Sequence, residues 1–300
     1  VTRVELGIQC LDDDILTKTH RGHTLADSIE ATQLLKDSFL KVGYHMMPGL
    51  PGSSHQKDIL MFKEIFENHD FKPDALKIYP CMVMAGTGLY HMYKKGLFKP
   101  ITTDVAAEII VEAKRYIPEY CRVMRVQRDI PTNITEAGVN KTNLRQYVEI
   151  LQKQKGVKCR CIRCREPRGR KIDWGSVKIS SKEYTASNSQ EVFISADDIK
   201  NDILLGFLRL RIPYKPFRPE IIPGSAGVRE LHVYGEATAF DLQGEIQHRG
   251  LGKQLMAEAE QIAQEKYDVK KMLVISGVGV REYYRKLGYF LEGPYMVKLL

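Results

Sequence analysis

The pattern of strands and helices changes once along this chain, and that change limits the available folds more than any other feature. Up to about residue 131, short apolar runs such as VELGIQ and ALKIY alternate with segments whose apolar residues recur at helical spacing. Such alternation predicts a parallel sheet covered by helices. From residue 176 onward, EVFISA, ILLGFLRLRI and VRELHV follow one another between Pro- and Gly-rich breaks, as antiparallel strands do. We therefore expect an α/β domain followed by an α+β domain.

The 300 residues exceed the usual size of one domain, which agrees with this division. We expect the first domain over residues 1–131, with helices near 25–41, 56–68 and 105–117. We expect the last domain over residues 176–300. The segment between them, 132–175, is predicted to be a connector that carries one short helix, NLRQYVEILQKQ.

The connector holds the excess positive charge of the chain. The formal net charge is +8, and the stretch from Lys141 to Lys178 alone has 12 Lys and Arg against 3 acidic residues, a local balance of +9. A basic segment on an otherwise neutral protein favours a polyanionic partner. The alternative is a solvated linker, but a linker has no need of the cysteines and the tryptophan found here.

Three of the six cysteines lie close together as Cys159, Cys161 and Cys164. This clustering favours a structural zinc site over a disulfide framework, although reduced thiols in a basic loop are the alternative. The fourth ligand is left open between Cys81, Cys121 and a histidine. The first residues contain no signal-peptide pattern, and no run of eighteen apolar residues exists, so we expect a cytoplasmic protein without a membrane span. The chain has no initiator Met and begins within a predicted strand, which indicates a start inside a domain.

A glycine turn, QHRGLG, runs directly into an amphipathic helix near residue 251. A helix N-terminus binds anions through its unpaired N–H groups, and glycines allow phosphates to approach the backbone. Gly252 is followed by Lys253 and Gln254 rather than by the Lys-Ser/Thr of a P-loop, and no Rossmann-type acidic strand follows. The order strand, Gln-x-x-Gly-x-Gly, helix, strand and Tyr-Tyr-x-Lys-x-Gly-Tyr resembles the GNAT acetyltransferase superfamily.

This resemblance implies that the acetyl-CoA diphosphate binds at the helix start and that the pantetheine arm pairs with the strand RELHVYG. It also implies that Tyr284 lies near the CoA sulfur and can protonate the departing thiolate. Glu230 and His232 are available as general bases. The implied cofactor-binding residues are Gln247, His248, Arg249, Gly250, Leu251, Gly252, Lys253 and Tyr283.

The N-terminal stretch from VELGIQ to MMPGLPGSS resembles the later part of a radical SAM barrel, that is, a partial (β/α) barrel. The resemblance implies that Gln9 and Arg21 hold the amino-acid moiety of S-adenosylmethionine. The three closely spaced cysteines that bind the [4Fe–4S] cluster in that superfamily are not in this sequence. Either the sequence is a fragment or its radical activity has been lost.

Together, the two halves and the segments QRDIP, CRCIRCRE, LLGFLRLR and QHRGLGKQLM resemble the catalytic subunit of Elongator in its stand-alone archaeal and bacterial form. That family installs a carboxymethyl group at C5 of the tRNA wobble uridine (uridine 34), using acetyl-CoA and S-adenosylmethionine. The anticodon stem-loop of tRNA is then the expected partner. The candidates for phosphate contact are Lys158, Arg160, Arg163, Arg165, Arg168 and Arg170.

Two other functions are weighed beside this one. A GNAT domain alone predicts a protein lysine acetyltransferase, for which Glu230 or His232 would act as the base. A tRNA-binding remnant without radical activity is the non-enzymatic alternative. The resemblance leaves open self-association and the presence of other Elongator subunits.

Overall fold

The computed structural model describes residues 1–127, 134–235 and 250–300. The described chain forms two compact units. The N-terminal unit comprises residues 5–30 and 42–164, and the C-terminal unit comprises residues 1–4, 31–41 and 165–300. The expected connector is not a unit of its own, because its residues are divided between the two at position 164. The sequence also gave no indication that residues 31–41 pack with the C-terminal unit.

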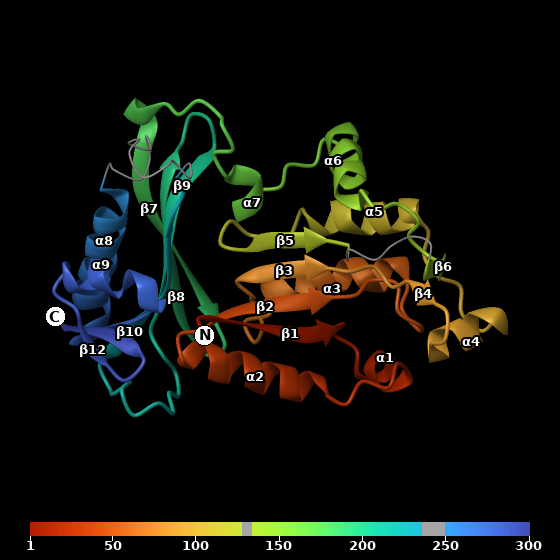
Figure 1. The fold of residues 1–300 in the computed structure, drawn as a ribbon, viewed down its shortest axis with the longest axis horizontal. Helices are drawn as coiled ribbons and strands as arrows, with labels where there is room; N and C mark the ends of the chain where they lie inside the picture. Colours follow the sequence, from red (N-terminus) through yellow and green to blue (C-terminus); the bar gives the residue numbers. More distant parts are fainter. Residues whose placement is uncertain (128–133, 236–249) are drawn as a thin grey trace. The chain divides into compact units, whose positions relative to one another are not determined.

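The N-terminal unit is built on a four-stranded sheet in the order β1–β2–β3–β5. Strands β2, β3 and β5 run parallel, and Figure 1 shows all four arrows pointing the same way. The strands of this unit are β1 (Arg3–Gln9), β2 (Lys41–Met46), β3 (Ala75–Ile78), β4 (Val83–Met84), β5 (Arg122–Val126) and β6 (Thr135–Ala137). Its helices are α1 (Asp13–Lys18), α2 (Leu25–Asp37), α3 (His55–Glu67), α4 (Gly88–Lys94), α5 (Thr103–Ala113), α6 (Leu144–Gln154) and α7 (Ile162–Arg165).

The three helices predicted in this part of the sequence are confirmed, with small shifts at their ends. Two helices end four residues early: α5 ends at Ala113 rather than near residue 117, and α2 ends at Asp37 rather than near residue 41. Phe39 adopts a left-handed conformation (φ 61°), and its N–H bonds to the Lys36 carbonyl. The helix therefore stops where Phe39 turns into the core of the C-terminal unit.

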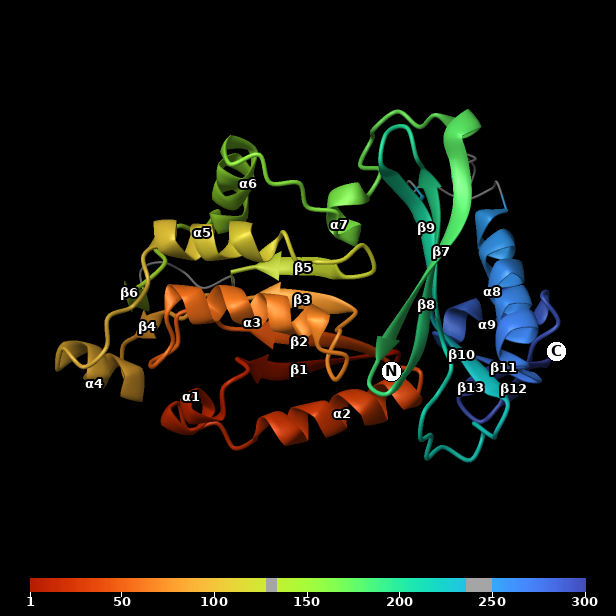
Figure 2. The ribbon, with the colours of Figure 1, turned by 180° about the vertical axis from the view of Figure 1, so that it is seen from behind.

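The C-terminal unit contains a seven-stranded sheet in the order β12–β13–β11–β10–β9–β8–β7 (Figure 2). All described strand pairs are antiparallel except β10 and β11, which are parallel. Its strands are β7 (Val177–Ala186), β8 (Ser189–Asp198), β9 (Ile203–Arg211), β10 (Ser225–Val233), β11 (Lys271–Ile275), β12 (Phe290–Glu292) and β13 (Tyr295–Leu299). Its helices are η2 (Trp174–Ser176), α8 (Leu251–Tyr267), η3 (Val278–Val280) and α9 (Arg281–Arg285).

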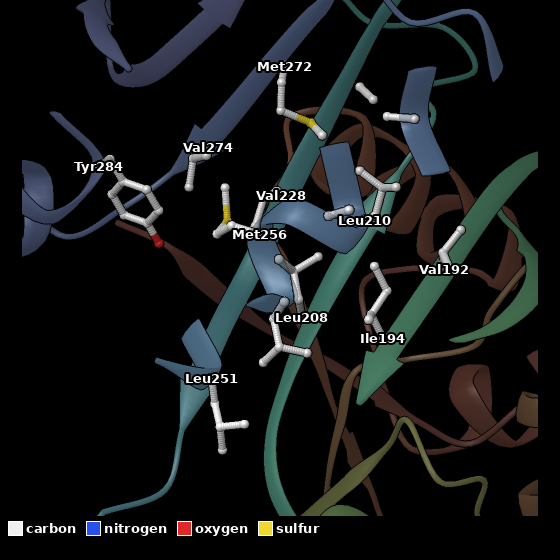
Figure 3. Close-up of a cluster of buried hydrophobic side chains, with 14 of the residues drawn as sticks. Val192, Ile194, Leu208, Leu210, Val228, Leu251, Met256, Met272, Val274 and Tyr284 are labelled. Carbon is white, nitrogen blue, oxygen red and sulfur yellow. The ribbon is translucent and has the colours of Figure 1, made fainter. Parts of the chain in front are cut away.

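Both faces of this sheet are covered within the C-terminal unit. On one face, Leu251, Met256 and other apolar residues of α8 pack against residues of β8–β11 (Figure 3). On the other face, Phe39 packs edge-on to Tyr295, with ring centroids 6.1 Å apart. A Cβ on Gly227 would lie 2.3 Å from the Phe39 ring, so only glycine fits there. Residues 31–41 thus complete the core of a unit whose main part begins at residue 165.

A group of five charged side chains, which we call the ionic cluster, lies on this second face. Its members have no exposed side-chain surface and are Lys36, Asp37, Glu191, Arg211 and Arg229. Glu191 accepts from Lys36 Nζ at 3.2 Å and from Arg229 Nη2 at 2.9 Å. Arg211 bridges Glu191 and Asp37, at 3.0 and 2.6 Å. Asp37 also accepts from the backbone N–H groups of Tyr214 and Lys215.

None of the helices among the described residues combines the length and the apolar content needed to cross a bilayer.

Candidate functional site

The C-terminal unit has a point where two neighbouring strands part. The β10–β11 ladder runs from Ser225 to Val228, paired with Lys271–Val274, and β10 then continues to Val233. At the same point the pairing of β10 with β9 shifts register between Val228 and Glu230, so Arg229 forms a bulge. The Arg229 guanidinium is fixed by Glu191, so the ionic cluster holds the bulge in place.

Helix α8 begins in a way that differs from α3 and α5, although α6 also has no side-chain cap hydrogen bond. Ser54 and Thr102 precede α3 and α5, and their hydroxyls accept from backbone N–H groups of the first turn. Before α8 stands Gly250 in a left-handed conformation (φ 73°), and no side-chain cap is found among the described residues. The N–H groups of Leu251 and Gly252 therefore have neither a described backbone partner nor a described cap, which makes this end suitable for an anion, whereas the Lys253 N–H bonds to the Gly250 carbonyl.

The side chain of Tyr283 lies directly over this helix start. A Cβ on Gly252 would be 2.7 Å from the Tyr283 hydroxyl, so the glycine leaves room for that group. Within the described residues, the buried Tyr283 hydroxyl has no hydrogen-bond partner. The same holds for Ser276 Oγ and Arg281 Nε, in the same short stretch after β11. Buried polar atoms are normally paired, so this concentration of unpaired atoms indicates a place for a polar ligand.

Tyr284, on α9, is 5% exposed and belongs to the apolar cluster beneath α8. Figure 3 shows its ring beside Val274, with the hydroxyl end directed toward the Leu251 side of the cluster. Burial raises the pKa of Tyr284 well above its ordinary value. The hydroxyl therefore keeps its proton at neutral pH and is chemically able to donate it.

The remaining residues predicted to bind the cofactor around this helix differ in their exposure. Leu251 is buried in the core, so only its backbone can face a ligand, whereas Lys253 is exposed. Gln247, His248 and Arg249 lie outside the described residues. The neighbouring strand β10 carries the two candidate bases, Glu230 and His232.

These two bases are in contrasting surroundings. Glu230 accepts from Arg209 Nε at 2.9 Å and pairs with Lys41 Nζ at 3.7 Å. Two cations therefore stabilise its ionised form. The His232 ring lies edge-on to Tyr234 and tilted against Phe207, with centroids 4.5 and 5.7 Å away.

In the N-terminal unit, the predicted pair Gln9 and Arg21 meet at the carboxyl end of β1. A Cβ on Gly7 would lie 2.8 Å from Gln9 Nε2 and 3.0 Å from Arg21 Nη2, and Arg21 donates to the Gly7 carbonyl. Gln9 is in the left-handed region (φ 68°), where a non-glycine residue is strained. The two side chains thus converge at the edge where such sheets bind ligands.

A charged group that was not predicted as a unit lies on the three strands beside this pair. Glu5 Oε2 accepts from His45 Nε2 at 2.8 Å and from Lys77 Nζ. The three residues come from β1, β2 and β3, and His45 and Lys77 are cross-strand partners. Side chains alternate between the two faces of a strand, and this alternation was the only sequence signal that these three residues share one face.

The three clustered cysteines are brought together. The Sγ atoms of Cys159, Cys161 and Cys164 lie within 4.8 Å of one another, close enough to bind one metal ion. Hydrogen bonds from the Cys159 and Cys164 thiols lower the pKa of Cys161. Neither Cys81 nor Cys121, considered above as a fourth ligand, belongs to this group among the described residues.

The basic residues of the predicted RNA-binding segment are not equally accessible. Lys158, Arg160, Arg168 and Arg170 are exposed, and Arg163 is half-buried. Arg165 departs from the prediction: its side chain is 3% exposed and pairs with Asp197 at 2.6 Å. A buried, paired guanidinium is not available to phosphates, so Arg165 is a structural residue of the C-terminal unit.

Two family models match this chain. Residues 73–155 match the Radical SAM C-terminal domain, and residues 162–289 match the Acetyltransferase (GNAT) family. The first match covers β3 and β5 of the four-stranded sheet, and the second covers β7 to β11 of the seven-stranded sheet.

Similarity to known proteins extends over the whole chain. It is 53% identical to a tRNA uridine(34) acetyltransferase of Methanocaldococcus jannaschii and 43% identical to the human Elongator complex protein 3, covering 100% of this chain in both. The chain spans 57% and 56% of the lengths of these relatives. A solved structure of the archaeal Methanocaldococcus infernus Elp3 with an N-terminal deletion superposes with a TM-score of 0.96 at 52% identity, covering 100% of this chain and 72% of that one.

Proposed function

This chain belongs to the Elongator complex protein 3 family, and from that premise we propose that it takes part in modifying the wobble uridine of tRNA, with acetyl-CoA as the acyl donor. The observation that carries the proposal is the start of α8. Glycines at 250 and 252, uncapped N–H groups and the unpaired Tyr283 hydroxyl form a seat suited to a diphosphate. Arg281 and Ser276, whose buried atoms also lack described partners, are further candidates for polar contacts with the cofactor.

The thioester lies farther along, where the strands part. The pantetheine arm follows β10 beyond the end of the β10–β11 ladder, which brings the sulfur toward α9. Water attacks the thioester carbonyl, the carbon–sulfur bond breaks, and Tyr284 gives its proton to the departing thiolate; a proton from the attacking water then restores the Tyr284 hydroxyl. The products are the acetyl unit as a carboxylic acid and CoA. Because its burial keeps Tyr284 protonated, it suits the role of acid rather than base.

The N-terminal unit is proposed to bind S-adenosylmethionine. Arg21 would hold the carboxylate of its amino-acid moiety, and Gln9 would orient the same end. When bound beside an iron–sulfur cluster, this cofactor supplies a radical able to activate a methyl group for attachment to C5 of uridine, a weak nucleophile. Among the described residues, the one group of three close metal-ligating side chains is the cysteine group, so no cluster ligands are assigned beside Gln9.

The exposed basic residues Lys158, Arg160, Arg168 and Arg170 are proposed to contact tRNA phosphates.

A zinc ion held by Cys159, Cys161 and Cys164 would fix the backbone that carries Lys158, the first of these basic residues. Reduced thiols held this close also fit a cytoplasmic protein. A thiol-modifying reagent should release about one zinc ion per chain from the purified protein, as measured by metal analysis. The Cys159→Ser variant should contain little zinc.

Lysine acetylation is the competing activity, and the surroundings of Glu230 argue against it. An attacking amine needs a base that can accept its proton, but the Glu230 carboxylate is held by Arg209 and Lys41. The half-buried His232 ring contacts the rings of Tyr234 and Phe207. The observed contacts therefore favour hydrolysis or transfer to RNA.

One assay separates the candidates. The full chain is incubated with acetyl-CoA alone, with tRNA and with a lysine-rich peptide, and free CoA and acetyl-lysine are measured. We expect CoA release that rises with tRNA and not with the peptide. Acetyl-lysine formation would establish the competing activity, and no turnover in any arm would indicate a tRNA-binding remnant. Tyr284→Phe should lower kcat more than it changes KM.

A further inference from the structure

Helix α4 stands out because nothing in the N-terminal unit buries it. None of its residues, all of which the structure describes, is buried, whereas α3 and α5 each bury five or more. Figures 1 and 2 show it at the end of the unit to which the arrows of β1, β2, β3 and β5 point. The surrounding segment, residues 85–99, contains Lys94, Lys95 and Lys99 and no acidic residue.

The surface of α4 combines the half-buried rings of Tyr90 and Tyr93 with the exposed His91 and Lys94. Lys94 Nζ lies 5.1 Å from the ring centroid of Tyr90 and 5.9 Å from that of Tyr93. The His91 ring stands edge-on to Tyr90, with centroids 5.8 Å apart. We call Tyr90, His91, Tyr93 and Lys94 the α4 strip. Its nearest acidic contact is a pair with Glu136 at 3.8 Å, which is weak because both side chains are exposed.

The other side of α4 forms one wall of a cavity of about 480 Å³. Leu89 and Met92 line it from the helix, Met47 and Met82 from the loops that follow β2 and β3, and Met84 from β4. Lys18 and His20 stand at its rim. Thioether sulfurs make favourable contacts with aromatic rings, so the cavity suits a flat heterocycle.

We propose that the α4 strip, together with this cavity, binds unpaired nucleotides of RNA. Bases stack on Tyr90 and Tyr93, a base enters the cavity, and Lys94 and Lys95 contact phosphates. Tyrosines and lysines without acidic residues complement single-stranded RNA, because every base offers a face for stacking and every phosphate a negative charge. The inference rests on the proposed RNA-modifying function and names where the loop nucleotides of that RNA bind.

The test uses the full chain and a synthetic anticodon-type stem-loop with 2-aminopurine at an unpaired loop position. Affinity and fluorescence quenching are compared for the unaltered chain, Tyr90→Ala/Tyr93→Ala and Tyr90→Phe/Tyr93→Phe. We expect the alanine pair to weaken stem-loop binding at least about fivefold and to abolish the quenching. The phenylalanine pair keeps both rings and should keep both signals. Tyr116→Ala, a half-buried tyrosine of the same unit outside α4, is the matched control.

Three further measurements make the result decisive. The alanine pair should bind a blunt RNA duplex as well as the unaltered chain does, because the duplex has no unpaired bases. S-adenosylmethionine binding should not change either; a loss there would show that the strip serves the cofactor and would overturn the inference. Lys94→Ala/Lys95→Ala should reduce the salt dependence of stem-loop binding.

The failure of this inference and that of the proposed function look different. Unchanged stem-loop affinity and quenching in the alanine pair would overturn the α4 inference alone. If the unaltered chain binds no RNA at all, both fail.

Discussion

The C-terminal unit contains two buried polar regions that are built in opposite ways. In the ionic cluster, Glu191 and Asp37 are surrounded by three cations and backbone N–H groups, and every charge has a partner. At the start of α8, the helix has no described cap and the buried Tyr283 hydroxyl has no described partner. The chain can satisfy buried polar groups, and at the second region none of the described residues does so.

This difference indicates that the ionic cluster serves stability and that the start of α8 serves binding. A buried charge must be paired within the protein, because a missing partner costs several kcal/mol. A polar group intended for a ligand is left unpaired in the free protein, and the ligand recovers that cost. Substitutions in the two regions should therefore affect different measurements.

The largest effect is expected in the ionic cluster. Glu191→Gln removes the carboxylate that three buried cations share, so the free energy of unfolding should fall by about 3–5 kcal/mol. Trp174, the single tryptophan, packs against the core of this unit, and its fluorescence during urea unfolding reports the change. The folded fraction of this variant should bind acetyl-CoA with unchanged affinity. A loss below about 1 kcal/mol would mean that the cluster does not hold the sheet.

A smaller effect, on binding alone, is expected at the start of α8. Gly252→Ala places a Cβ against the Tyr283 hydroxyl, so acetyl-CoA should bind about ten- to a hundredfold more weakly in calorimetric titration. Stability should stay the same or rise, because alanine is the better helix former. Gly277→Ala is the control, since a Cβ there meets nothing within 4 Å. Equal affinities for the two variants would contradict the assignment.

Removing the Tyr283 hydroxyl should change stability and binding in opposite directions. Tyr283→Phe deletes a buried group without a described partner, so the free protein should become slightly more stable. Acetyl-CoA should bind about three- to tenfold more weakly, because one hydrogen bond is lost from the complex. The melting temperature and the titration together check this. A destabilised variant with unchanged affinity would show that the hydroxyl is structural.

The smallest effect is expected at a surface pair. Glu183, on β7, pairs with Lys266 of α8, and both side chains are partly exposed. Glu183→Gln should lower the free energy of unfolding by less than about 1 kcal/mol. The same tryptophan-monitored unfolding provides the comparison with Glu191→Gln. A similar loss in both would remove the contrast between buried and exposed charge.

Local patterns explain what could be predicted from the sequence. The helix beginning near residue 251, the alternating strands and helices and the cysteine group all depend on residues a few positions apart. Each is present in the structure. The convergence of Gln9 and Arg21 followed from a family resemblance and agrees with their positions around Gly7.

Long-range packing explains what could not be predicted. Lys36 and Glu191 are 155 residues apart, so no pattern links them, and α2 alone gives no reason to pack with a later sheet. Arg165 belongs to a basic run whose other members are mostly exposed, and only its partner Asp197 distinguishes it. In α4, Tyr90, Tyr93 and Lys94 have the spacing of an ordinary helix surface, and only the lack of any buried residue in this helix sets them apart.

The most direct test of the account is an amide NMR titration with a non-hydrolysable desulfo analogue of acetyl-CoA. The account predicts large shifts of the Leu251 and Gly252 N–H signals. The same titration with acetylated pantetheine, which lacks the diphosphate, should leave these two signals nearly unchanged. If both compounds shift them equally, or if neither does, the diphosphate does not bind at the start of α8.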